Sequence, residues 1–427
     1  MADNPKPARL VVLCVDGMHP DLYRRAAELR PKVANIQALA LAGASADAME
    51  SVYPSTTYPA HATLVTGTPP RVHGIYSHLA SLDPTDPARP WHWFARAIRV
   101  PALWSVARAR GLKTAAVSWP VSARAPIDFN IPEIWDPAAL DPHQDFRTVA
   151  QHATPGLFEE LATALPLSPH QADPDHLRGE AALYLWKKYR PDLLLVHFVG
   201  YDRQAHHYGP RSCEAMAALE NADAEIGRLR DAASSEDSVT FVVLSDHGFL
   251  PVEKEVAPLV ILGEEGLFGT NGEGKPELRR LGAVQGGGSF AVFWVETPTA
   301  AERDALARAL ERLRGTGAVA EVVDRGRLES LGSDPDAEWM LDAAPGFCFC
   351  SRFEGPAVSE SAEDRGTHGH LPAREGMQAS FIIAGPGVAP GWNLRRIKLT
   401  DVAPTLAARL GMPPDSLASD VGPLRLG

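Results

Sequence analysis

Residues 239–248 read VTFVVLSDHG, an apolar run of strand length that ends in Asp-His-Gly. Two other apolar runs end similarly: Asp16-Gly17 follows RLVVLCV (9–15), and Asp202 closely follows DLLLVHFV (192–199). Runs that are apolar throughout are typical of strands buried on both faces of a parallel sheet. Parallel strands present their carboxyl ends at one edge, so we expect the three carboxylates to converge there.

Helical patterns separate these runs. We predict helices over 31–43, ended by Gly43, and over 102–111, 213–230 and 399–411, with further strands at 113–119 and 380–385. Thr400 or Asp401 would cap the last helix, and Gly411 would end it. The alternation predicts an α/β domain with a mostly parallel central sheet flanked by helices.

The segment 254–345 has a different pattern. Strands are predicted at 289–296 and 317–323, and the helix between them should begin with a capping box of Thr299 and Glu302. Leu306, Leu310 and Leu313 form its apolar stripe. We therefore expect a small α+β cap over 254–345, inserted into a catalytic domain formed by 1–253 and 346–427. The polar stretch 359–376 is predicted to be a long loop.

Composition excludes several classes of protein. The 427 residues carry a net charge of -12, which argues against a nucleic-acid surface. The four cysteines, which include Cys348 and Cys350 in one predicted strand, do not suggest a disulfide framework. No apolar segment is long enough to span a membrane, and no signal-peptide h-region precedes the first strand, so we expect a soluble cytoplasmic protein.

Carboxylates and imidazoles follow the predicted strands. The candidate metal ligands are Asp16, Asp202, His206, Asp246, His247 and, in a loop, His368, with His370 an equally possible neighbour. Asp16-Gly17 alone could be a simple turn, and Asp202 and His206 share a helical face that also suits a plain hydrogen bond. Together they exceed what one tetrahedral Zn²⁺ uses, so we expect two divalent ions, Zn²⁺ first, with Mn²⁺ or Fe possible. Two such cations favour a phosphoryl substrate.

A threonine pair opens another predicted helix in STTYPAHATLVTG (55–67). Threonine is a common helix N-cap, but a hydroxyl placed on a metal could also be a nucleophile. The local stretch does not decide between the two roles, or between Thr56 and Thr57.

These motifs resemble those of the nucleotide pyrophosphatase/phosphodiesterase family of the alkaline phosphatase superfamily. The resemblance rests on Thr57-Tyr58-Pro59-Ala60-His61, LVTG (64–67), His73-Gly74-Ile75 and DRQAHHYGP (202–210), and it covers 9–250 and 365–411. It implies an alkaline-phosphatase-like fold with Thr57 as the nucleophile. It also implies two metal-ligand sets, Asp16, Thr57, Asp246 and His247 for one ion and Asp202, His206 and His368 for the other.

The resemblance further implies hydrolysis of phosphodiester or pyrophosphate bonds in a small phosphate ester or nucleotide, through a covalent phospho-threonine. Tyr58 would stack on the substrate or pack in the core. The family's phosphoryl-binding Asn falls on His78, Ala60 replaces another Asn, and Val121 stands where Gly is usual. A phosphonate hydrolase, a phosphomonoesterase and a non-catalytic metal-binding protein are the alternatives. WHWF (91–94), followed by Arg96 and Arg99, could shape the pocket or pack a loop.

Overall fold

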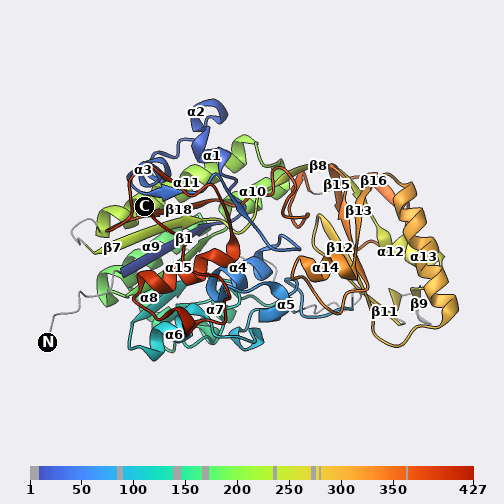
Figure 1. Cartoon of the computed structure of the whole chain (residues 1–427), viewed down its shortest axis with the longest axis horizontal. Coiled ribbons are helices and arrows are strands. Elements are labelled where there is room, and N and C mark those ends of the chain that lie inside the picture. The colour runs from blue at the N-terminus through green and yellow to red at the C-terminus, as the bar shows by residue number, and fades with distance from the viewer. Residues whose placement is uncertain are drawn as a thin grey trace.

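The computed structural model describes residues 9–83, 90–137, 146–165, 173–233, 238–270, 276–277, 280–361 and 364–427. Residues 1–8, on which the expected lack of a signal sequence depends, lie outside these ranges. The chain forms two lobes, and the smaller one contains most of residues 258–349 (Figure 1). In the described part of the chain, no helix combines the length and apolar character needed to cross a bilayer.

One eight-stranded sheet, in the order β19-β2-β18-β7-β1-β6-β4-β5, forms the centre of the larger lobe. Its strands are β1 (Arg9–Val15), β2 (Ala44–Ser45), β4 (Thr114–Val117), β5 (Phe129–Ile131), β6 (Leu193–Phe198), β7 (Val239–Leu244), β18 (Phe381–Ala384) and β19 (Trp392–Asn393). Neighbours from β7 to β5 are parallel, which confirms the predicted sheet. Strand β18 is antiparallel to both β7 and β2, which the sequence did not indicate.

Both faces of this sheet are covered by helices (Figure 1). Val11, Leu13 and Val15 of β1 belong to a buried cluster with α3 (Ala34–Ala42), α9 (Pro174–Tyr189) and α11 (Cys213–Ala233). The intervening Leu10, Val12 and Cys14 belong to a second cluster with α4 (Thr57–Thr66), α6 (Leu103–Ala109) and α15 (Val402–Arg409). A strand buried on both faces has no polar side to show in its sequence, which explains its continuous apolar run.

The predicted helix starts need one correction. The stretch 399–411 begins with a 3₁₀ turn, Leu399–Asp401, and α15 follows it. The Asp401 carboxylate accepts the Lys398 N–H at 2.7 Å and makes no side-chain cap on α15. Asp401 therefore caps the preceding turn and not the α-helix, and Thr400 lies inside that turn.

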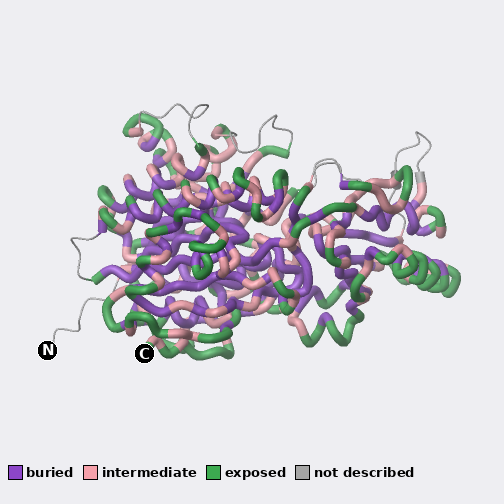
Figure 2. The backbone as a smooth tube through the Cα atoms, turned by 90° about the horizontal axis from the view of Figure 1, so that it is seen from above, coloured by how far each residue is buried: buried purple, intermediate pink, exposed green. Residues whose placement is uncertain are grey.

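The smaller lobe contains an antiparallel sheet of β11 (Leu281–Gln285), β12 (Ser289–Trp294), β14 (Trp339–Ala343) and β13 (Val319–Asp324). Helix α13 (Ala300–Gly315) begins with the predicted Thr299–Glu302 capping box, buries Leu306 and Leu313, and half-buries Leu310. Its outer side is exposed (Figure 2). The α+β character is as expected, whereas the boundaries at 254 and 345 stay a prediction.

Strand β8 (Leu250–Val256) connects the lobes, pairing with β15 (Gly346–Phe349), β16 (Val358–Glu360) and β17 (Gly366–Thr367). The stretch 359–376 is thus not loop throughout, because strands β16 and β17 contribute to it. The remaining helices are α1 (Asp21–Arg24), α2 (Ala26–Leu29), α5 (Pro70–His73), α7 (Phe146–His152), α8 (Leu157–Ala164), α10 (Gly200–Tyr208), α12 (Pro258–Glu264) and α14 (Arg325–Ser330). Short strands are β3 (Ala48–Glu50), β9 (Gly269–Thr270), β10 (Pro276–Glu277) and β20 (Arg396–Lys398).

Candidate active site

Three aspartates lie at the carboxyl ends of three adjacent strands. Asp16 directly follows β1, Asp246 follows β7, and Asp202 lies in the first turn of α10, which follows β6. Because β1 lies between β6 and β7, the three carboxylates converge at one edge of the sheet. All three are buried, and the Gly17 N–H donates to Asp246 Oδ1 at 3.2 Å.

Three histidines face these carboxylates, and each has its Nδ1 atom against a backbone carbonyl. Nδ1–H of His206, His247 and His368 donates to the carbonyl oxygens of Gly366, Gly248 and Ser55 at 3.1, 3.0 and 3.2 Å. In its neutral form, each ring would present its Nε2 lone pair to the carboxylates. His247 Nε2 lies 3.3 Å from Asp16 Oδ1, while the Nε2 atoms of His206 and His368 lie 3.7 Å from Asp202 oxygens. A nitrogen lone pair that faces a carboxylate oxygen is repelled by it unless a proton or a cation lies between the two atoms.

The ligand atoms form two overlapping groups. Those of Asp202, His206 and His368 lie within 4.8 Å of one another, and so do those of Asp16, Asp202 and His247. His247 Nε2 is also 3.2 Å from Asp246 Oδ2. One buried oxygen each of Asp16, Asp202 and Asp246 has no hydrogen-bond partner in the structure. All six predicted ligand side chains are therefore brought together, with unpartnered donor atoms that fit divalent cations.

Burial and mutual repulsion make this cluster electrostatically costly without a cation. Burial, followed by the charge of Asp246, raises the pKa of Asp16 well above its ordinary value. Burial also raises the pKa of Asp202. Burial would raise the pKa of Asp246 as well, but His247 and His61 outweigh it and lower that pKa. Burial lowers the pKa of His368, and the neighbouring His247 and His206 lower it further, which keeps this imidazole neutral.

The structure separates the two threonines. Thr57 is the first residue of α4, and its Oγ1 lies 3.4 Å from His247 Nε2. Thr56 is the N-cap residue, but its hydroxyl makes no capping bond and has no partner. His61, one turn later, donates from Nδ1 to the Thr57 carbonyl at 2.8 Å and so holds the start of the helix. Of the two threonine hydroxyls, that of Thr57 contacts a member of the ligand cluster, His247.

Two residues of this site were not foreseen. His197 donates from Nε2 to Asp16 Oδ2 at 2.9 Å and from Nδ1 to Glu133 Oε2 at 3.1 Å. Burial alone would lower the pKa of His197, but these two carboxylates raise it to about 10. Glu133 Oε1 also accepts the Tyr58 hydroxyl at 2.9 Å. The one indication in the sequence was a histidine inside the apolar run 192–199, where a polar residue needs a buried partner.

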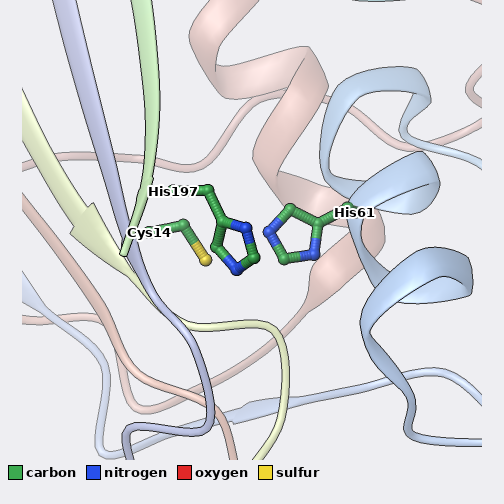
Figure 3. Close-up of side chains that lie close together, drawn as sticks. All are labelled: Cys14, His61 and His197. Carbon is green, nitrogen blue, oxygen red and sulfur yellow. The ribbon is translucent and has the colours of Figure 1, made fainter. Parts of the chain in front are cut away.

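Behind the ligands, Cys14, His61 and His197 lie close together (Figure 3). His61 and His197 meet edge to face, with ring centroids 4.4 Å apart. Both His197 nitrogens are occupied as donors, so this ring has no lone pair for a metal. Burial also raises the pKa of the Cys14 thiol, which disfavours a thiolate ligand. This cluster supports the site without itself resembling a metal site.

A cavity of about 1080 Å³ opens at Thr57, and residues of both lobes line it. Tyr58 and His78, the expected substrate-binding residues, are part of the lining. Tyr58 is fully buried, and Trp91 packs its edge against Tyr58 and also contacts His78, with ring centroids 5.2 and 4.6 Å away. Trp91 of the WHWF stretch thus forms part of the cavity wall.

The smaller lobe contacts the ligand loop directly. In the glycine turn between β11 and β12, the Gly288 N–H donates to the His368 carbonyl at 2.7 Å. Asp342 of β14 accepts the Leu371 N–H at 2.8 Å and pairs with Arg374. The loop that carries His368 is therefore held by contacts with the smaller lobe.

Comparison with known proteins gives a family match over most of the chain. The family described as type I phosphodiesterase / nucleotide pyrophosphatase matches residues 10–370. Among curated proteins, venom phosphodiesterase 2 of Crotalus adamanteus is 26% identical over 251 residues, which are 56% of this chain and 26% of that protein. Ectonucleotide pyrophosphatase/phosphodiesterase family member 3 of Mus musculus is 25% identical over 255 residues, 56% of this chain and 24% of that protein. The aligned region thus spans about a quarter of each relative's length.

Solved structures show the same fold. An inactive variant of murine ectonucleotide pyrophosphatase / phosphodiesterase 5, in complex with AMP, superposes with a TM-score of 0.66 at 17% identity and covers 97% of both chains. The human counterpart gives a TM-score of 0.65 at 16% identity, with 97% coverage of each chain. Since the family match spans most of its length, the chain belongs to the type I phosphodiesterase / nucleotide pyrophosphatase family.

Proposed function

We propose that this protein is a metal-dependent hydrolase of phosphodiester bonds that uses Thr57 as its nucleophile. The observation that carries the proposal is the position of Thr57 Oγ1, 3.4 Å from the Nε2 atom of His247, a member of the convergent cluster of carboxylates and imidazoles. Family membership supports the reaction class.

Two divalent cations fit the donor set. Asp16, Asp246, His247 and the Thr57 hydroxyl would hold one, and Asp202, His206 and His368 the other. Carboxylate oxygens and neutral imidazoles suit Zn²⁺, and the backbone carbonyls on each Nδ1–H fix the tautomer that a metal needs. When bound, such cations would offset the charge of the phosphoryl group and lower the pKa of a coordinated hydroxyl.

The chain's own groups account for the bond changes. Thr57 Oγ1 releases its proton to solvent and forms a bond to phosphorus, while the ester oxygen of the leaving group departs with its bonding electrons and takes up a proton from water. A second water then releases a proton to solvent and forms a bond to phosphorus, while the bond from phosphorus to Oγ1 breaks and Oγ1 regains a proton, which restores the threonine. The N-terminus of α4 favours the negative charge of the phosphoryl oxygens.

A substitution pair tests the nucleophile. With zinc-loaded protein and bis-p-nitrophenyl phosphate, Thr57→Ala should lower kcat by at least about a thousandfold because the attacking oxygen is lost. Thr56→Ala is the matched control and should keep most of the activity, since its hydroxyl makes no bond. Full turnover by Thr57→Ala, or a metal content near one ion per chain, would contradict the proposal.

A further inference from the structure

One side of the cavity continues away from the ligand cluster into an apolar arm. Helices α7, α8 and α9 form this arm with the segment after β5. Phe146 of α7 and Phe158 of α8 lie with ring centroids 6.1 Å apart. The apolar side chains that line the arm include Ile131, Ile134, Trp135, Phe146, Val149, Phe158, Leu161, Ala162, Leu165 and Leu177.

Among the residues that the structure describes, the polar side chains of Glu133 and Arg178 in this arm are already engaged. Glu133 accepts hydrogen bonds from Tyr58 and His197. Arg178 donates to Asp175 and to the Ser118 hydroxyl at 2.7 and 3.1 Å. A nucleoside entering here would find little to replace the hydrogen bonds that its ribose and base make with water.

Tyr58, the ring that directly follows Thr57, does not offer an open stacking surface, whereas Trp91 and Trp135 are half-buried in the cavity lining. Tyr58 is fully buried, and its hydroxyl donates a hydrogen bond to Glu133. Its ring also makes an edge-to-face contact with Trp91. Trp91 in turn meets Trp135 with ring centroids 4.7 Å apart. These rings pack against one another and lead from Thr57 toward the aliphatic side chains of the arm.

We propose that the apolar arm binds an aliphatic chain esterified to the phosphoryl group, so that the preferred substrates are alkyl phosphodiesters rather than nucleotides. The inference rests on the proposed function, because it places the scissile phosphorus at Thr57. The arm is continuous with the cavity at Thr57, which lets one substituent enter it while phosphorus stays at the ligand cluster.

Transfer of a methylene group from water to an apolar site predicts a dependence on chain length. A fully buried methylene would raise kcat/KM about fourfold, and partial burial would reduce that factor. For a series of alkyl p-nitrophenyl phosphate diesters, assayed below micelle formation, we expect kcat/KM to rise at least about tenfold from the methyl to the octyl ester. The p-nitrophenyl ester of thymidine 5′-monophosphate should be a poorer substrate than the octyl ester.

Substitutions that fill the arm test its location. Val149→Trp should flatten the chain-length dependence, because half-buried Val149 lines the arm. Ala162→Trp, at an exposed position that also lines it, gives a second test if Val149→Trp folds poorly. Val421→Trp is the matched control, since Val421 is 40% exposed and lies outside the cavity lining, and it should keep the wild-type dependence.

The outcomes separate the inference from the proposed function. If none of the diesters is hydrolysed, or if Thr57→Ala hydrolyses them as well as the wild type does, the proposed function fails. If the diesters are hydrolysed with Thr57 dependence but kcat/KM does not rise with chain length, or the thymidine ester leads, the apolar-arm inference is overturned. A rise that persists unchanged in both tryptophan variants would also overturn its location.

Discussion

At the scale of single residues, the site depends on hydrogen bonds that hold its aromatic and imidazole side chains in place. Glu133 joins Tyr58, the neighbour of the proposed nucleophile, to His197, which in turn holds Asp16. The sequence pointed to Asp16 and Thr57, because strand ends and motifs are local features. It did not point to Glu133, because only the fold brings residues 58, 133 and 197 together.

Glu133→Gln should weaken metal binding because the new amide cannot accept from both Tyr58 and His197 as the carboxylate does. We expect a metal dissociation constant about tenfold higher, with a matching fall in kcat at limiting metal that excess metal partly restores. Competition with a chromophoric chelator would measure the affinity. Exposed Glu214→Gln is the control, and equal affinities in the two variants would exclude a positioning role for Glu133.

Asp334 offers a test of buried charge away from the ligands. Burial raises its pKa to about 6, above the value near 3.8 of an exposed aspartate. The folded protein therefore binds a proton more tightly than the unfolded chain, so this group costs stability as pH rises from about 4 through 6. Asp334→Asn should raise the free energy of unfolding by about 1–2 kcal/mol at pH 7, with the gain vanishing near pH 4.

Denaturant titrations at both pH values would measure this difference. Exposed Asp415→Asn should change neither value. A loss of stability in Asp334→Asn at pH 7 would show that its carboxylate is charged and favourably paired in the fold.

At the scale of elements, the strands that precede the candidate ligands could be predicted from the sequence. The strands that pair with them at one side of the sheet were harder to predict. Strands β1, β6 and β7 have apolar sequences because both faces are buried, and α13 shows its capping box. The antiparallel direction of β18 and the two-residue strands β2 and β19 follow from long-range pairing that no local pattern encodes. The contact between the glycine turn after β11 and the His368 loop could not be predicted either, because it also joins segments that are far apart in the sequence.

Gly287→Ala tests whether this turn positions His368. A Cβ at Gly287 would lie 2.2 Å from Thr367 Oγ1 and 3.0 Å from the His368 carbonyl oxygen, so the ligand loop must shift. We expect metal affinity and kcat/KM to fall about tenfold, as for other supporting contacts around metal ligands. Chelator competition and diester hydrolysis would measure the two quantities.

The control for Gly287→Ala is Gly391→Ala. Both glycines have φ of +67°, but a Cβ at Gly391 meets no atom within 4 Å. Both variants should therefore lose about 1–2 kcal/mol from the left-handed backbone alone. Equal metal affinities in the two variants would mean that the turn tolerates a side chain without moving His368.

At the scale of the whole molecule, the ligand cluster connects segments that are far apart in the chain. Asp16, Asp202 and Asp246 come from three strand ends of the larger lobe, and His368 comes from a loop held by the smaller lobe. Cations bound among them would offset the repulsion of the buried carboxylates and stabilise the folded state as a whole. Binding of one ligand at a thousand times its dissociation constant adds about 4 kcal/mol to the stability of a folded protein.

Chelation of the metals should therefore lower the Tm by several degrees at pH 7.5, and added Zn²⁺ should restore it. His368→Asn should reduce the Zn²⁺-dependent rise in Tm, because one ligand set is broken while the other remains. Exposed His207→Asn, on the same helix as His206, should keep the full rise and serves as the control. Calorimetry of the wild type with and without Zn²⁺ decides the point: an unchanged Tm would mean that the carboxylates are neutralised by protons, and the two-metal site would be wrong.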